Sequence, residues 1–322
     1  LATSTIITMS SHHWLLAWLG LELNTLSILP IIMKPQHPRA TEATTKYFLI
    51  QTTAATMILF AGTMNTLQTG QWSIMEASTT ATLLTTIAIM MKLGLAPVHS
   101  WYPQVLQGVT MYTALVISTW QKLAPLALLY MMHNHLHPPT LMLIGLLSSL
   151  VGGWGGLNQT QTRTIMAFSS VAHMGWLITA LTINPSLATL TMLMYITMTT
   201  AMFTPLATTN AKTITDIGTT WSMSPATLTT TMVTLMSLGG LPPLTGFMPK
   251  WLILKDLLAT NTALLATLIL LSSLPSLFFY IRLAYLTMLT TPPGTTPTKH
   301  QWRFKPTYPA NMATLITATA LL

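Results

Sequence analysis

The long stretches without a charged side chain are the feature that most constrains the fold of this chain. None of residues 123–162 is Asp, Glu, Lys or Arg, and none of residues 164–211 is. A helix that crosses a bilayer needs about 20 apolar residues, so each stretch has room for about two crossings. The pattern predicts membrane helices, because the in/out alternation that is typical of a membrane β-barrel is missing from the sequence.

The shortage of charge extends over the whole chain. There are 13 Lys+Arg and 5 Asp+Glu residues among 322, where a soluble protein of this length would carry about 80 charged residues. This shortage excludes a soluble enzyme and a disordered chain. It also excludes a nucleic-acid-binding protein, since the basic residues form no run despite a net charge of +8. The chain has no Cys, which excludes disulfides, thiolate metal sites and Fe–S ligation within it.

Threonine takes much of the place of the missing charged residues. Its hydroxyl can bond to the backbone of its own helix, so it is tolerated in a membrane. Dividing the length by about 28 residues for one span and its loop gives about eleven spans. We predict an all-α, polytopic transmembrane helical bundle. The predicted spans are 1–10, 13–33, 47–66, 81–101, 109–131, 140–158, 163–183, 187–208, 226–258, 262–290 and 309–322.

The chain begins at Leu1 and stops within the apolar run ATLITATALL, so we expect both ends to be truncated. Alternate loops differ in positive charge, which orients the bundle. Lys255, beside Asp256, is the basic residue of one side. The other side should face the compartment where the chain is made, and it carries Lys34, Arg39, Lys46, Arg163, Lys212, Lys299, Arg303 and Lys305.

Two spans are interrupted by glycine and proline, and they read MMKLGLAPVHSWYP and MSLGGLPPLTGFMPKW. A proline inside a helix frees a backbone carbonyl, which in a membrane must find water, a side chain or an ion. Such breaks therefore line polar cavities. The alternative is a pair of kinks that only aid packing. The predicted break positions are Gly94, Pro97, Gly239, Gly240, Pro242 and Pro243.

The two interrupted spans lie five spans apart, and this spacing predicts an internal duplication. Because five is odd, the second set of spans is inverted relative to the first, as in inverted-repeat transporters. We predict a single membrane domain, 1–322, with two inverted five-helix repeats, each with a broken helix. The repeats cover about 1–131 and 140–290, and a C-terminal helix follows at about 309–322.

Away from the span ends, the predicted spans contain four Lys or Arg residues and one acidic residue: Lys92, Lys122, Lys250, Arg282 and Glu22. Such residues are costly in a membrane and are functional candidates. A desolvated lysine can release its proton, whereas arginine stays charged. We therefore predict that the three lysines, together with Glu22, transfer protons. Separation of a Glu–Lys pair would act as an electrostatic proton switch.

Other interpretations of these residues remain open. Glu22 and one lysine could form a static ion pair, Lys122 could extend to the headgroups, and Arg282 could be interfacial. His173, near the middle of a span, is either a proton relay or a hydrogen-bonded core histidine. The run HNHLH at 133–137 predicts a solvated loop rather than a metal site, because no carboxylate or Cys accompanies it.

Several segments together resemble a known family. They read SSHHWLLAWLGLELNTLSILP, KLGLAPVHSWYPQVLQG, STWQKLAPL, GGWGGLNQTQTR and LGGLPPLTGFMPKW. They are similar to the NADH–ubiquinone oxidoreductase chain 2 family of animal mitochondria, which are antiporter-like membrane subunits of respiratory complex I. The likeness runs from about residue 10 to 305. One departure is at Gln104, near which mammalian members carry an acidic residue.

The resemblance implies a proton-translocating subunit of an NADH:ubiquinone reductase in the mitochondrial inner membrane, with its basic loops toward the matrix. By position, Glu22 and Lys92 match a membrane glutamate and its partner lysine. Lys122 matches the central lysine, and Lys250 the lysine that hands protons onward. NADH, FMN, Fe–S clusters and ubiquinone are implied in other subunits, so no cofactor is expected in this chain. Implied partners are the other membrane subunits and the bilayer, including cardiolipin.

Two other functions fit the same residues. A stand-alone cation/proton antiporter of the Mrp type would also have inverted repeats and membrane lysines. A scaffold bundle within a complex would have the spans and no proton path. Association with a large redox assembly would favour the complex I subunit over the stand-alone antiporter. Ordered water inside the helix bundle would argue against the scaffold.

Overall fold

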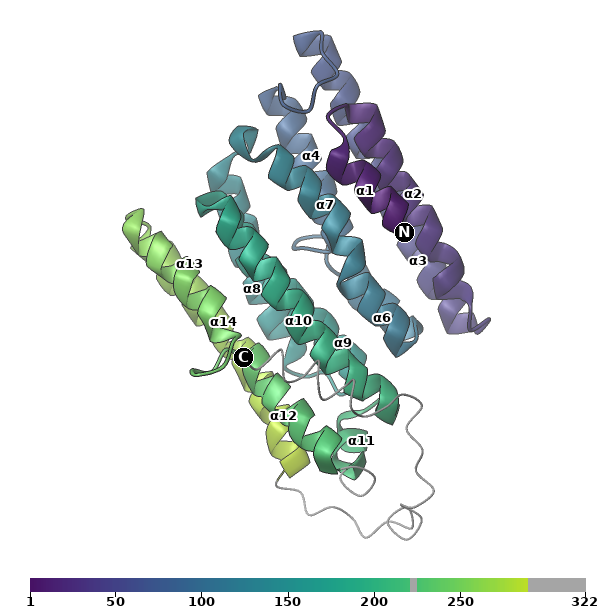
Figure 1. The fold of residues 1–322 in the computed structure, drawn as a ribbon, viewed down its shortest axis with the longest axis vertical. Coiled ribbons are helices and arrows are strands. Elements are labelled where there is room, and N and C mark those ends of the chain that lie inside the picture. Colours follow the sequence, from purple (N-terminus) through teal and green to yellow (C-terminus); the bar gives the residue numbers. More distant parts are fainter. Residues whose placement is uncertain (221–224, 289–322) are drawn as a thin grey trace. The chain divides into compact units, whose positions relative to one another are not determined.

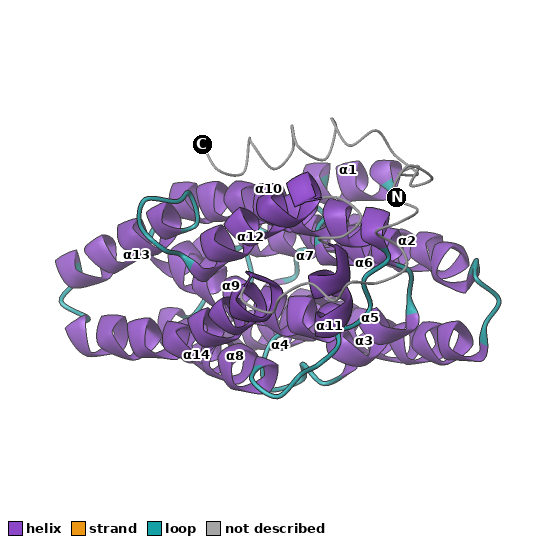
Figure 2. Ribbon diagram, turned by 90° about the horizontal axis from the view of Figure 1, so that it is seen from below, coloured by secondary structure: helices purple, strands orange, loops and turns teal. Residues whose placement is uncertain are grey.

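A computed structural model describes residues 1–220 and 225–288, and within these ranges every element of regular structure is a helix (Figures 1 and 2). The chain divides into two compact units, Leu1–Ser148 and Ser149–Leu322. The boundary falls within helix α8, Pro138–Gly156. The predicted span 309–322 lies outside the described residues.

The first unit is built from α1 to α7, a short 3₁₀ helix and the start of α8. The bounds are α1 Ala2–Ser10, α2 Trp14–Met33, α3 Pro38–Thr69, α4 Thr79–Leu93, α5 Trp101–Gly108, α6 Met111–Ser118, α7 Trp120–Met131 and η1 His133–His135. In the second unit, the bounds are α9 Thr162–Ile183, α10 Pro185–Thr209, α11 Ile214–Thr219, α12 Pro225–Gly239, α13 Phe247–Ala259 and α14 Ala263–Met288.

Seven helical segments in the described residues are long and apolar enough to cross a membrane: Trp14–Met33, Pro38–Thr69, Met111–Met131, Pro138–Gly156, Thr162–Ile183, Pro185–Thr209 and Ala263–Leu286. The predicted span 226–258 consists of α12, a break and α13, whereas in the predicted span 81–101 helix α4 ends at Leu93 and α5 begins only at Trp101. The prediction of an all-helical polytopic membrane bundle is therefore confirmed.

Three local details differ from the predicted spans. Helix α3 begins at Pro38 rather than at residue 47, because the ring of His37 caps it by accepting from Arg39 N at 3.2 Å. The expected loop after the first break is helix α5. The predicted span 109–131 is interrupted at Thr119, whose hydroxyl donates back to Leu115 O at 2.7 Å.

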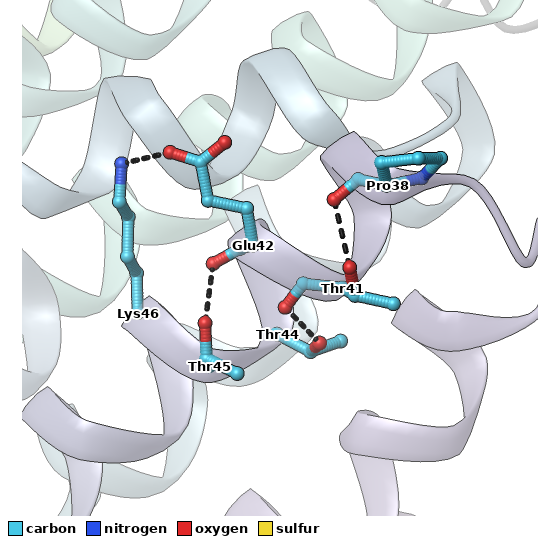
Figure 3. Close-up of polar contacts among 6 residues, drawn as sticks. All are labelled: Pro38, Thr41, Glu42, Thr44, Thr45 and Lys46. Carbon is cyan, nitrogen blue, oxygen red and sulfur yellow. Dashed lines mark hydrogen bonds and ion pairs between the residues drawn. The ribbon is translucent and has the colours of Figure 1, made fainter.

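Threonine hydroxyls bond back to their own helices, as predicted. In the first turns of α3, Thr41, Thr44 and Thr45 each donate to the carbonyl three residues earlier, at 2.7–2.9 Å (Figure 3). The same figure shows Lys46 paired with Glu42 one turn away, on the exposed side of the helix. These internal bonds satisfy the hydroxyls without a partner helix, which is why the apolar spans tolerate so many of them.

Both predicted helix breaks are present. In the first unit α4 ends at Leu93, and Gly94 takes a left-handed φ of 71°. In the second unit α12 ends at Gly239, and Gly240 takes a φ of 79°. Glycine adopts this left-handed conformation more readily than residues with a Cβ atom. Pro97, Pro242 and Pro243 lie in the non-helical segments that follow.

Each unit also pairs two of its loops in the same way. In the first, Trp14 N donates to Trp72 O, and Ile74 N donates to His12 O, both at 3.1 Å. In the second, residues 160–162 and 212–214 pair likewise, also at 3.1 Å. The repeated pairing joins the start of the second helix of each unit to the loop after the third. It supports an internal duplication, while the inverted relation of the repeats stays a prediction.

Candidate functional site

A small polar cavity inside the first unit is lined by two of the predicted lysines. Lys92 comes from the last turn of α4 and Lys122 from α7. Gln51 of α3 and Gln121 of α7 also line it. The cavity is large enough for a water molecule. The buried Nε2 of Gln121 has no hydrogen-bond partner among the described residues, so the cavity offers a water a donor as well.

Lys92 is held against the backbone of α3. Its side chain is buried, and Nζ donates to the carbonyl of Gln51 at 3.4 Å. In return, Nε2 of Gln51 donates to the carbonyl of Lys92 at 3.3 Å. This second bond satisfies a carbonyl in the last turn of α4, where the helix ends and its own amide partners run out. The sequence analysis missed Gln51; the signal available was an amide side chain inside an apolar span.

The predicted direct pair of Glu22 and Lys92 is not formed. No ion pair joins them in the part of the chain that the structure describes, since the amine turns to Gln51 instead. The static-pair interpretation fails for Lys92 on the same ground. Glu22 still acts electrostatically on Lys92 and on Tyr47. Its Oε2 is buried without a hydrogen-bond partner among the described residues.

Lys122 lies in the interior of the first unit. Its side chain is 3% exposed, and Nζ lies 5.0 Å from the centroid of the Tyr102 ring. A lysine that extends to the headgroups would keep its charged end exposed. Burial therefore contradicts that alternative for Lys122. The helix interruption at Thr119 lies three residues before Lys122.

A buried amide bridge joins the helix of Glu22 to the helix of Lys122. Asn24 Nδ2 donates to Gln121 Oε1 at 2.8 Å, and Ser4 of α1 donates to Asn24 Oδ1 at 3.3 Å. The bridge ties α1, α2 and α7 together beside the cavity. The sequence analysis did not identify it, because an amide at a helical position does not show which of its neighbours it meets.

Replacing Asn24 with alanine is expected to lower the stability of the assembled protein by about 1–3 kcal/mol, because Gln121 would lose its buried donor. Thermal unfolding of the purified complex measures the change. Ser27→Ala is the matched control, since Ser27 donates only to the carbonyl of Asn24 within its own helix. Equal stability of the two variants would contradict the bridge.

A second cavity, inside the second unit, brings two predicted residues together. His173 of α9 and Lys250 of α13 both line it, with Trp176 and Tyr195. Nζ of Lys250 donates to the carbonyl of Gly239 at 3.1 Å and lies 5.9 Å from the Trp176 ring. The break therefore leaves the carbonyl of Gly239 free to accept a hydrogen bond from Lys250, as the sequence analysis expected. The ring of His173 lies 5.9 Å from that of Tyr195.

The remaining candidates lie outside both cavities. Arg282 is half-buried, and its guanidinium donates to the carbonyl of Leu157 at 2.7 Å, so it ties α14 to the end of α8. His133, His135 and His137 are exposed around η1, which agrees with a solvated loop. Within residues 1–220 and 225–288, no three His, Cys, Asp or Glu side chains gather as metal ligands would.

Helical membrane units that each have an interrupted helix and a lysine lining an internal cavity define a protein of the antiporter-like class. The family model described as "NADH:quinone oxidoreductase/Mrp antiporter, TM" matches residues 11–276. The model described as "NADH dehydrogenase subunit 2 C-terminus" matches residues 277–322.

Similar named proteins identify the family within this class. NADH-ubiquinone oxidoreductase chain 2 of Xenopus laevis is 50% identical over 323 residues, covering 100% of this chain and 92% of the relative. That of Polypterus ornatipinnis is 52% identical over 305 residues, covering 95% and 88%. The chain belongs to the NADH-ubiquinone oxidoreductase chain 2 family, as the resemblance predicted.

Solved structures share the fold. A chain of respiratory complex I from Thermus thermophilus with bound aureothin has a TM-score of 0.85 and 26% identity, covering 100% of this chain and 76% of that one. A chain of the Mrp complex from Dietzia sp. DQ12-45-1b has a TM-score of 0.83 and 17% identity, covering 91% and 60%. At that identity the second likeness concerns the fold alone.

Proposed function

We propose that this chain is a proton-translocating membrane subunit of respiratory NADH:ubiquinone oxidoreductase, in which Lys92, Lys122 and Lys250 load and release protons. The observation that carries the proposal is a pair of small cavities, one in each unit. Each cavity is lined by a lysine that is held next to a helix break, and the lysines are buried in the first cavity and half-buried in the second.

The chemistry follows from where the amines lie. Desolvation penalises the ammonium form of a lysine, so a modest change in nearby charge decides whether it holds its proton. Lys92 and Lys122 line one cavity. Glu22 acts on Lys92 without contact, so movement of α2 relative to α4 would alter the balance. His173 lines the cavity of Lys250 and could pass a proton to it.

We infer that the driving redox chemistry belongs to other subunits. The chain has no Cys to ligate an Fe–S cluster, and we assign NADH, FMN and ubiquinone to the rest of the complex. The excess of basic residues on one side supports a multi-pass orientation in the mitochondrial inner membrane with those loops toward the matrix. Cardiolipin among the surrounding lipids is part of the same proposal.

The stand-alone antiporter and the scaffold bundle predict different results. An antiporter would purify apart from redox activity, whereas the proposed subunit co-migrates on a native gel with NADH dehydrogenase activity and with other membrane subunits. A scaffold would show no ordered water in either cavity in a high-resolution map. Mass spectrometry of the native band identifies the partners directly.

The proposal is tested by Lys92→Ala in the assembled complex, reconstituted into liposomes. Proton uptake per NADH is expected to fall by about tenfold or more, since a positioned proton carrier contributes at least that factor. Lys34→Ala is the control, because Lys34 is exposed at the end of α2. Unchanged uptake in Lys92→Ala, with normal assembly, would count against the assigned role of Lys92.

A further inference from the structure

An aromatic ring faces the amine that lies deepest in the first unit. Nζ of Lys122 lies 5.0 Å from the centroid of the Tyr102 ring, and the two side chains are 3% and 1% exposed. A cation within about 6 Å of a ring centroid is attracted by the ring's quadrupole, and more strongly away from water. A neutral amine lacks this attraction. The ring therefore favours the protonated form of Lys122 over the neutral form.

The helix break fixes this ring in place. Tyr102 stands in the first turn of α5, where its backbone N donates to His99 O at 3.1 Å. The ring of Trp101 meets it edge-on, with centroids 5.5 Å apart. A Cβ atom on Gly94 would lie 3.0 Å from Tyr102 Cβ. Because glycine has no Cβ atom, the side chain of Tyr102 can pack closely against the backbone at the break. The ring thus belongs to the interrupted helix, while the amine belongs to α7.

The other charged and titratable groups around Lys122 come from four neighbouring helices. Lys92 of α4 and Tyr47 of α3 line the same cavity. Glu22 of α2 acts on both of those residues. Tyr112 of α6 is exposed, and α1 carries no titratable side chain. Tyr102 of α5 places its ring under the Lys122 amine.

We propose that Tyr102 is a positioning residue that holds the ammonium of Lys122 over its ring and so links proton loading at Lys122 to the position of α5 at the helix break. This inference rests on the proposed function. The second unit offers an independent instance, because the amine of Lys250 lies 5.9 Å from the Trp176 ring. A shift of α5 against α7 would withdraw the ring and favour proton release.

The test compares Tyr102→Phe with Tyr102→Leu in the complete complex, reconstituted into liposomes, with proton uptake per NADH measured across pH. Phenylalanine keeps a ring face, so its profile should match that of the unchanged protein. Leucine removes the ring, and the alkaline limb of the profile should move to lower pH by about 0.5–1 unit. Tyr130→Leu is the matched control, since Tyr130 is an exposed residue of α7.

Tyr102→Met is a second ring-free variant, whose flexible side chain fills irregular space. It should move the limb in the same direction as leucine. An unmoved limb in the ring-free variants, or an equal shift in Tyr102→Phe, would overturn the inference. If Lys122→Ala pumps normally, the proposed function itself fails. If Lys122→Ala is inactive and the ring-free variants behave as the unchanged protein, only the role of Tyr102 is lost.

Discussion

Replacing Lys122 with alanine is expected to abolish proton pumping by the assembled complex, while NADH oxidation with an artificial electron acceptor continues. The residue is buried and lines the first cavity together with Lys92. Lys122 is the one lysine in the sequence of α7, so no other amine of this helix can replace it. We expect proton uptake per NADH in liposomes to fall by at least about tenfold. The acceptor assay reports electron transfer upstream of this chain and should keep its rate.

The substitution Lys122→Arg tests whether pumping needs only a positive charge at this position or a side chain that can release a proton. Arginine keeps the positive charge but does not release its proton at working pH. Lys122→Arg should therefore assemble and yet pump as poorly as the alanine variant. Lys255→Ala is the control for removal of a lysine, because Lys255 is exposed on α13. Full pumping in both Lys122→Ala and Lys92→Ala would refute the assigned proton path.

Replacing Gly246 with alanine is expected to destabilise the folded segment between α12 and α13 severely. Gly246 precedes α13 and lines the cavity of Lys250. A Cβ atom there would collide with the carbonyl oxygen of Ser237 and lie 2.8 Å from its carbonyl carbon. Backbone cannot move aside as a flexible side chain can, so we expect a loss of about 3 kcal/mol. The amount of assembled complex and its melting temperature measure the effect.

Gly239→Ala is the matched control within the same break. The nearest atoms to a Cβ at Gly239 belong to Tyr280, at 3.8 and 3.9 Å, which is ordinary contact. The carbonyl that accepts from Lys250 belongs to the backbone and remains in this variant. We expect assembly close to that of the unchanged protein. If Gly246→Ala assembled as well as Gly239→Ala, the close approach at the break would not be required.

The interrupted helices were predictable because their cause is local. Gly94 and Gly240 allow a left-handed backbone, and the prolines that follow remove amide donors, so the chain itself dictates where each helix ends. The start of α3 was missed because the ring of His37 caps it, and a histidine cap is not among the usual signals. The interruption at Thr119 carries no glycine, and its neighbours carry no proline.

The partners of the lysines were not predictable in the same way. The family resemblance implied that Lys92 is the partner of Glu22, but the amine instead meets the backbone of Gln51. Any backbone carbonyl within hydrogen-bonding distance can accept from a lysine amine, so the residue type does not identify the acceptor. Tyr102 was not singled out either, since an aromatic residue in an apolar segment is ordinary core composition.

The sequence by itself determined that the chain is a helical membrane bundle, where two of its helices break and which ionisable residues lie within the spans. These properties follow from charge, hydrophobic length and backbone chemistry, all of which act over a few residues. Only the tertiary structure decided that Lys92 and Lys122 share one cavity, that His173 and Lys250 line another, and that Tyr102 faces an amine. Those contacts depend on how helices far apart in the chain rotate and pack, which short stretches of sequence do not specify.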